Sequence, residues 1–167
     1  MKSVIKDKVR INPFYRFLIK RYIYSKLDSH GLCSGDIRST YHQDHNLQLR
    51  KTFQPLVKKI NKTSKNFFDA NLIITAMWSN VGDYNSKVIR HNHIDNDIST
   101  DLFRQRGISG VFYLKKPKNS GNFITDGGII EVSEGDVLFF SPHLFHQTEK
   151  NKSRRKRIAI SFNGYLL

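Results

Sequence analysis

The chain has 167 residues, enough for one domain with a buried core and too few for two ordinary domains. Hydrophobic residues make up 38% and aromatic residues 12%, a composition that excludes a disordered chain, and no apolar run is long enough to span a membrane. The formal net charge is +14, and the single cysteine, Cys33, excludes an internal disulfide bond.

The start of the chain and its cysteine content bear on location. Residues 1–10 are charged and lack the apolar stretch of a signal peptide. A lone cysteine fits a reducing compartment. We therefore expect a cytoplasmic protein.

The positive charge is concentrated in three segments of the chain. Residues 1–30 carry eight basic and two acidic side chains, and residues 50–65 and 150–157 carry six basic side chains each and no acidic one. Residues 67–149 have a net charge of −3. Such a basic periphery either attracts a polyanion, such as nucleic acid or an acidic protein, or is a solvated face. The solvated face is favoured because no nucleic-acid-binding motif accompanies the charge.

Two helices are expected before residue 67. Asn12 followed by Pro13 predicts a helix start, and apolar residues at helical spacing continue to Leu27. This helix is expected to pack on the domain, the alternative being a membrane surface. Residues 28–46 are expected to form a loop. A second helix is expected from Leu47, with Pro55 as a break or a start and residues 61–66 as its exit.

After residue 70 the pattern changes to short strands separated by glycine or polar residues. Eight strands are predicted, over residues 72–78, 87–94, 108–114, 122–125, 129–132, 136–140, 144–148 and 157–162. Gly127 and Gly128 between two of them are a hairpin signal. The fold class is therefore mainly β with N-terminal helices, and the strand number favours a double-sheet jelly roll, cupin-like, over a parallel sheet.

We expect a single domain over residues 1–167. Within it, residues 1–66 are predicted to form a basic helical region that packs on the barrel, and residues 67–167 the jelly-roll core.

Three histidines form a candidate metal site. His91 and His93 are two residues apart, and in a strand this spacing puts both side chains on one face. His146 follows 53 positions after His93, near a predicted strand. Two ligands from one strand and a third from an opposing strand make a three-ligand site. Such a site leaves positions open for a substrate and dioxygen, as non-heme iron oxygenases require.

A candidate anion-binding arginine lies on the last predicted strand. Alternation puts Arg157, Ala159 and Ser161 on one face of this strand and three apolar residues on the other. The first face is suited to a cavity and the second to packing. A guanidinium fixed in a cavity is the right group to bind a carboxylate by two parallel hydrogen bonds.

Taken in order, these residues resemble a known family. The matching pieces are Trp78-Ser79-Asn80, Gly82, His91-Asn92-His93, Ser109 to Leu114, Gly121, Gly135 to Phe140, His146, and Arg157 to Asn163. Residues 77–167 resemble the 2-oxoglutarate- and Fe(II)-dependent oxygenases found in many phage and bacterial genomes. The resemblance implies a double-stranded β-helix and a dioxygenase, with Fe(II) held by His91, His93 and His146. It also implies that Arg157 binds the distal carboxylate of 2-oxoglutarate, with Tyr113 and Ser161 as helpers.

The sequence departs from the wider superfamily at the second metal ligand. Relatives use His-x-Asp, whereas this chain has His91-x-His93 and also His93-Ile94-Asp95, so Asp95 is a competing ligand. Residues 94–106 are rich in Asp and Asn and are either a lid or substrate loop or a plain surface insertion. Trp78 and Tyr113 are expected to be core aromatics more than substrate platforms. His143 is expected to be structural or solvated, and His30, His42 and His45 give no ligand pattern.

The leading functional hypothesis is a dioxygenase, specifically a hydroxylase, whose substrate is an anionic macromolecule or a small metabolite. One alternative is a non-catalytic barrel that binds a polyanionic partner through its basic periphery. Another is a cupin-like metal enzyme with three histidines and no 2-oxoglutarate. The oligomeric state is not predicted.

Overall fold

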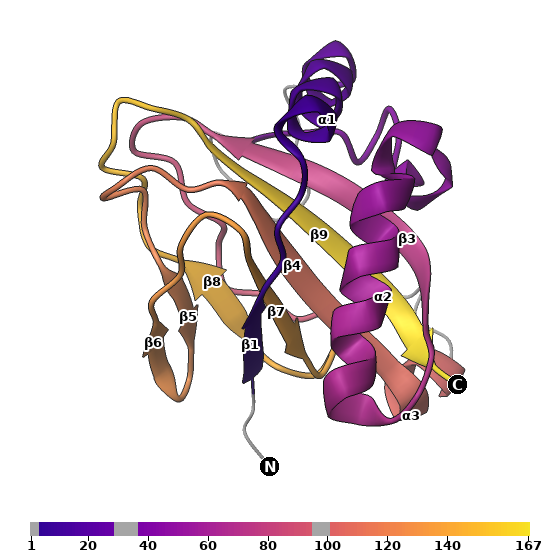
Figure 1. Ribbon diagram of the computed structural model, residues 1–167. Helices are drawn as coiled ribbons and strands as arrows, with labels where there is room; N and C mark the ends of the chain where they lie inside the picture. Colours follow the sequence, from indigo (N-terminus) through magenta and orange to yellow (C-terminus); the bar gives the residue numbers. More distant parts are fainter. Residues whose placement is uncertain (1–3, 29–36, 95–100) are drawn as a thin grey trace.

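The computed structural model describes residues 4–28, 37–94 and 101–167. Two antiparallel sheets form its centre (Figure 1). The large sheet has six strands in the order β1-β7-β4-β9-β3-β2. These strands are β1 (Val4–Lys8), β2 (Ile37–Ser39), β3 (Leu72–Gly82), β4 (Gly107–Lys115), β7 (Asp136–Phe140) and β9 (Arg157–Leu166).

The small sheet has three strands in the order β6-β5-β8 and faces one side of the large sheet (Figure 1). Its strands are β5 (Phe123–Thr125), β6 (Gly128–Ile130) and β8 (His146–Thr148). Two opposed antiparallel sheets with long-range strand crossovers are the predicted jelly roll, the double-stranded β-helix. The predicted fold class is thus confirmed.

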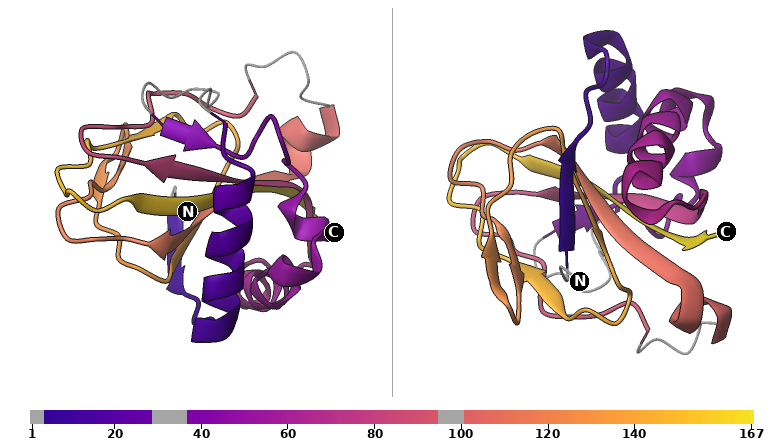
Figure 2. Two further views of the ribbon diagram at one scale, coloured as in Figure 1. Left: turned by 90° about the horizontal axis from the view of Figure 1, so that it is seen from above. Right: turned by 60° about the horizontal axis from the view of Figure 1, so that its bottom comes forward.

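Helices α1 and α2 cover the other side of the large sheet (Figure 2). The bounds are α1 (Pro13–Ser25), the 3₁₀ turns η1 (Leu47–Leu49) and η2 (Lys51–Phe53), and α2 (Gln54–Phe68). The short α3 (Asp101–Arg106) precedes β4 and contacts β4 and β9. In the described part of the chain, no helix combines the length and the apolar character needed to cross a bilayer.

The large sheet separates two apolar clusters. On the helix side, Ile158, Ile160 and Phe162 of β9 are fully buried together with side chains from α1 and α2. On the side of the small sheet, the cluster includes Tyr113 and Phe123, with Ala159 packed against it. The predicted alternation along β9 is therefore correct: its apolar face packs under the helices, and its other face is turned toward the small sheet.

The start of α1 follows the sequence signal. The helix expected from Leu47 instead begins as the 3₁₀ turns η1 and η2, and α2 starts only at Gln54. The Asn12 side chain accepts a hydrogen bond from the Phe14 backbone N–H at 2.8 Å, which caps α1 as predicted. Pro55 lies in the first turn of α2 and is a start, not a break. The predicted exit over residues 61–66 is wrong. The helix continues to Phe68 because Thr63 and Ser64 still face the buried side.

Three further expectations differ from the structure. Residues 87–94 do not form a strand and make only isolated bridges, among them the one between His91 and His146. The expected loop over residues 28–46 contains β2, and β1 and α3 were not predicted. The division at residues 66 and 67 stays a prediction, since the N-terminal region contributes β1 and β2 to the large sheet as well as helices.

Candidate metal centre

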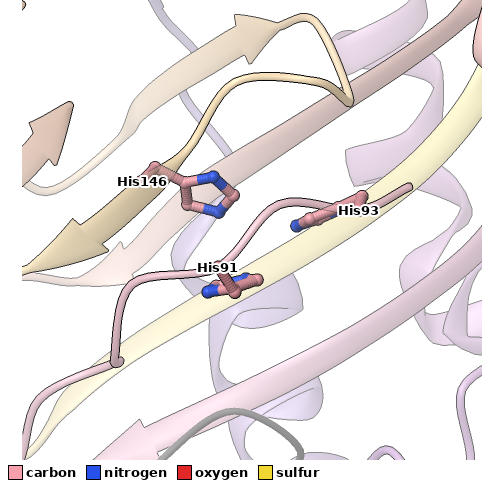
Figure 3. A group of neighbouring side chains, drawn as sticks. All are labelled: His91, His93 and His146. Carbon is pink, nitrogen blue, oxygen red and sulfur yellow. The ribbon is translucent and has the colours of Figure 1, made fainter. Parts of the chain in front are cut away.

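His91, His93 and His146 come together between the two sheets. One ring nitrogen from each lies within 4.8 Å of the other two. The ring centroids are 4.3 Å apart for His91 and His146, 5.1 Å for His93 and His146, and 5.3 Å for His91 and His93. Figure 3 shows the three rings grouped around one common space.

Backbone hydrogen bonds place these rings without a strand on the side of His91 and His93. The backbone N–H groups of His91 and His146 each donate to the other residue's carbonyl, at 3.0 and 2.9 Å. The backbone N–H of His93 donates to the Pro142 carbonyl at 2.9 Å. The segment is thus attached to the chain around β8 at both histidines. The rings of His91 and His93 lie on the same side of their segment, as predicted. These backbone hydrogen bonds place them there, and not the side-chain alternation of a strand.

Each imidazole is held at its Nδ1 atom. Nδ1 of His91 lies 2.9 Å from the Ile89 carbonyl oxygen, and Nδ1 of His146 lies 2.9 Å from the Leu144 carbonyl oxygen. A carbonyl oxygen only accepts hydrogen bonds, so Nδ1 carries the proton in both rings. The Nε2 lone pair is therefore free in both rings. This is the usual arrangement of metal-ligating histidines, whose other nitrogen donates to an acceptor.

Burial keeps the three rings neutral. It lowers the pKa of His91, and it lowers the pKa of His93 to about 4 and that of His146 to about 3. Neutral imidazole nitrogen is the form that binds a metal. Three neutral nitrogen donors that point into one space fit a divalent transition ion such as Fe(II). Asp95, the competing ligand, lies outside the described residues.

Arg157, the first residue of β9, lies in the same cavity. It is only 3% exposed. Its Nη1 donates to the Ser120 carbonyl at 2.5 Å, and its Nη2 donates to the Thr148 hydroxyl at 3.0 Å. Burial lowers the pKa of Arg157 from its ordinary value, but a guanidinium still carries its charge at neutral pH. Within the described residues no carboxylate lies within 4.0 Å of it.

Two glycines lie beside this side chain, and one of them makes room for it. Gly82, opposite Arg157 in the sheet, would place an added Cβ in ordinary contact with Nη2, at 3.8 Å, and 2.7 Å from the Ser86 hydroxyl. At Gly121 an added Cβ would lie 2.9 Å from Nη1 and 2.4 Å from the Glu149 carbonyl oxygen, and the backbone there has a φ of +84°. Only glycine fits this position without a shift of the backbone. Both glycines belong to the pieces that carry the family resemblance.

One cavity of about 140 Å³ contains both the histidines and the arginine. Tyr113, Ala159 and Ser161 line it, as do Trp78 and Asn80. Within the described residues nothing hydrogen-bonds to the Tyr113 hydroxyl, and burial raises the pKa of that group. Tyr113 therefore offers a neutral donor next to the arginine charge.

The other histidines of the described chain do not belong to this site. His143 is exposed, and its Nε2 lies 2.8 Å from the Arg104 carbonyl oxygen. His42 and His45 are exposed and do not line the cavity, and His30 and Cys33 lie outside the described residues.

Asn163 was named only as the end of a motif, yet its side chain contacts His93. No spacing rule links these two positions, which are 70 residues apart.

Comparison with known proteins supports the resemblance in one segment and in the fold. Residues 127–159, which include His146 and Arg157, match the family Phytanoyl-CoA dioxygenase (PhyH). No curated protein matches the chain.

Several solved structures share the fold. HygX from Streptomyces hygroscopicus, solved with nickel and 2-oxoglutarate bound, superposes with a TM-score of 0.71 at 13% identity, over 98% of this chain and 82% of that chain. The viral collagen prolyl hydroxylase of Paramecium bursaria Chlorella virus-1, a 2-oxoglutarate complex, gives 0.63 at 16% identity, over 98% and 97%. A prolyl-4-hydroxylase of Pseudomonas putida gives 0.65 at 16% identity, over 98% and 92%. The chain thus has the double-stranded β-helix of 2-oxoglutarate oxygenases.

Proposed function

We propose that the protein is a 2-oxoglutarate- and Fe(II)-dependent dioxygenase that hydroxylates its substrate. One observation carries the proposal: a single cavity has three neutral imidazoles at one end and a buried guanidinium with no carboxylate partner in the described chain at the other. A buried, unpaired charge is costly unless a ligand of opposite charge joins it. A dicarboxylate that also binds a metal satisfies both ends at once.

Each end of the cavity would have its own task. His91, His93 and His146 would hold Fe(II) through Nε2. The iron, when bound, supplies the oxidation of 2-oxoglutarate by dioxygen to succinate and carbon dioxide, with the second oxygen atom going to the substrate. Arg157 would hold the distal carboxylate of 2-oxoglutarate by charge-assisted hydrogen bonds.

The floor between the two ends is suited to an extended ligand. The small side chains of Ala159 and Ser161 on β9 leave space there. Tyr113 on β4 lies opposite Ala159, and Trp78 on β3 lies opposite Ser161. The Tyr113 hydroxyl would add a hydrogen bond to the distal carboxylate, and Ser161 one further along the ligand. Apolar walls such as Phe123 and Phe140 would keep bulk water away from the reacting atoms.

Aromatic side chains also line the cavity beside the metal site. The Trp78 ring centroid lies 6.1 Å from that of His93, and Tyr41 packs edge-on against Trp78 at 5.4 Å. Because Trp78 lies on the cavity wall, its ring is available to the substrate as well as to packing. The substrate would approach the iron along this wall.

The test is formation of succinate from 2-oxoglutarate in the presence of Fe(II) and dioxygen. We expect the wild type to form succinate, and the His146→Ala and Arg157→Gln variants to lose it. Arg155→Gln is the matched control, because Arg155 belongs to the same basic run but is exposed. Binding of 2-oxoglutarate to the anaerobic Fe(II) protein, followed by charge-transfer absorption, checks the same variants when no substrate is present.

Two outcomes would favour the other readings. Iron binding with no use of 2-oxoglutarate, and no effect of Arg157→Gln, would indicate a three-histidine enzyme of the cupin type. Binding of a polyanion that is salt-sensitive and survives loss of His91 and His146, without iron or 2-oxoglutarate binding, would indicate a non-catalytic barrel.

A further inference from the structure

The three histidines of the metal site differ in what holds them. His91 and His146 donate to backbone carbonyls two residues before each of them, so their orientation is set by local backbone. Nδ1 of His93 instead lies 2.7 Å from Oδ1 of Asn163, a side chain on β9. His93 is therefore oriented by a side chain of β9, 70 residues away in the sequence.

Asn163 is itself held by a second side chain. Ser109 on β4 lies directly opposite Asn163 in the sheet and is fully buried. The Ser109 hydroxyl donates to Oδ1 of Asn163 at 2.8 Å and lies 3.0 Å from Nδ1 of His93. Oδ1 of Asn163 thus accepts two hydrogen bonds at once, one from the serine and one from the imidazole.

This pair decides which nitrogen of His93 is free. With Oδ1 turned toward the ring, the proton must sit on Nδ1 and Nε2 keeps its lone pair. If the amide were reversed, its NH₂ group would donate to Nδ1, and the proton would move to Nε2, which could then bind no metal. The Ser109 hydroxyl, by donating to Oδ1, stabilises the first arrangement.

We propose that Asn163, fixed by Ser109, is a positioning residue that selects the metal-binding tautomer of His93. The inference rests on the metal-binding part of the proposed function and not on the oxidation. Loss of a side chain that orients a metal ligand typically weakens metal binding about 10- to 100-fold. We expect a loss of that size when the acceptor at position 163 is removed.

The test compares Asn163→Leu with Asn163→Asp. Leucine has a similar size and no acceptor, whereas aspartate keeps an acceptor for the Nδ1 proton. With Co(II) as the probe, we expect Asn163→Leu to bind about 10- to 100-fold more weakly and Asn163→Asp to stay within a few-fold of the wild type. Trp78 is the only tryptophan and lies beside His93, so quenching of its fluorescence reports binding.

Asn80→Leu is the matched control. Asn80 also lines the cavity, on β3, but it makes no hydrogen bond to a histidine within the described residues. We expect its Co(II) affinity to equal that of the wild type. Equal affinity in Asn163→Leu and the wild type would overturn the inference. Equal weakening in both Asn163 variants would reduce Asn163 to a packing role and would overturn it as well.

A second measurement needs neither metal nor activity. The nitrogen chemical shifts of a histidine side chain report which ring nitrogen carries the proton. In metal-free wild type and in Asn163→Asp we expect the His93 proton on Nδ1, and in Asn163→Leu we expect this preference to be lost. A wild-type proton on Nε2 would refute the inference even if the variants failed to fold. Absence of succinate formation would leave it standing, so the two proposals fail separately.

Discussion

Individual residues divide the cavity into a neutral end and a charged end. Burial lowers the pKa of each of the three histidines and thus removes charge where a cation would bind. At the other end burial cannot discharge Arg157, because a guanidinium keeps its proton at any ordinary pH. The same low-dielectric environment therefore prepares one end for a metal ion and the other for a carboxylate.

Tyr113→Phe tests the hydroxyl next to Arg157. Its removal breaks no hydrogen bond within the described residues, so we expect the thermal midpoint to stay the same or rise slightly. A hydrogen bond to a carboxylate is worth about 1.5–3 kcal/mol, so the dissociation constant of 2-oxoglutarate should rise roughly 10- to 100-fold. Titration of the Ni(II) protein with 2-oxoglutarate and a thermal melt measure the two quantities.

Tyr15→Phe serves as the control, since Tyr15 is exposed on α1. Neither quantity should change in this variant. A drop in the thermal midpoint of Tyr113→Phe without loss of 2-oxoglutarate affinity would show that the hydroxyl serves the fold and not the ligand.

Sequence patterns predicted the elements that carry their own signal. β7 was predicted to the residue, and β4 and β5 were predicted with errors of one residue at their ends, because each alternates or follows a glycine. β9 was predicted from its first residue but continues four residues beyond the predicted end, to Leu166. β1 and β2 carry no such signal. β1 contains Lys6 and Asp7 and forms only by pairing with β7, more than 120 residues away in the chain. Edge strands of this kind depend on a partner that local sequence does not reveal.

The site followed the same rule. The histidines and Arg157 were found from residue type, order and a family resemblance, and the structure brings them into one cavity. Asn163 and Ser109 lie in the pieces that carry the resemblance, but their role could not be predicted, since it arises from the register of β4 against β9. The position of Trp78 also depends on the sheet, because it is the β3–β9 pairing that turns its ring toward His93.

A buried aspartate joins α1 to the turn that precedes α2. Asp44 accepts hydrogen bonds from the Tyr22 hydroxyl of α1 at 2.6 Å, from Nε of Arg50 at 2.8 Å and from the Asn46 backbone at 3.0 Å. Burial alone would raise the pKa of Asp44, but the hydrogen bonds from Arg50, Tyr22 and Asn46 outweigh it and lower the pKa to about 2. One carboxylate thus links α1 to the chain that leads into α2.

Asp44→Asn should destabilise the protein in a pH-dependent way. The folded-state pKa lies below the ordinary value of 3.8, so the contribution of Asp44 is fully present above about pH 4 and is lost as the pH falls through about 2. At pH 7 we expect a loss of about 1.5–3 kcal/mol in the free energy of unfolding, the worth of hydrogen bonds to a charged group. Denaturant unfolding at several pH values measures it.

The exposed pair of Asp126 with Arg90 supplies the comparison. Asp126→Asn should change the free energy of unfolding by less than about 1 kcal/mol, since exposed ion pairs are worth little. If Asp44→Asn and wild type lost stability in parallel between pH 4 and pH 2, the carboxylate would not be the group responsible.

At the scale of the whole molecule, the fold gathers basic segments that are distant in sequence. Burial, with Lys115 and Arg16 close by, lowers the pKa of Lys20 on α1, and Lys156 lies 6.0 Å from the Tyr24 ring on the same helix. Basic side chains of α1 and Lys156 of the 150–157 segment therefore lie in one region. Four exposed lysines of α2 lie on the side of the large sheet opposite the cavity. Polyanion binding by this periphery stays a prediction, separate from the cavity.

The metal site also joins parts of the molecule that are far apart in the sequence. His146 begins β8 of the small sheet, His91 and His93 belong to the segment after β3, and His93 is hydrogen-bonded to Asn163 of the large sheet. An ion bound by all three histidines would link both sheets through one centre. Metal binding to the folded chain alone must then stabilise the whole domain.

Ni(II) at about 100 times its dissociation constant should add about 2.7 kcal/mol to the free energy of unfolding. For a domain of this length that corresponds to a rise of roughly 5–11 °C in the thermal midpoint. A chelator should reverse the rise, and His146→Ala should abolish it. Mg²⁺, which prefers oxygen ligands, should give no rise in the wild type. If His146→Ala gained as much from Ni(II) as the wild type, the ion would be binding elsewhere, and the three histidines would not be the centre that links the two sheets.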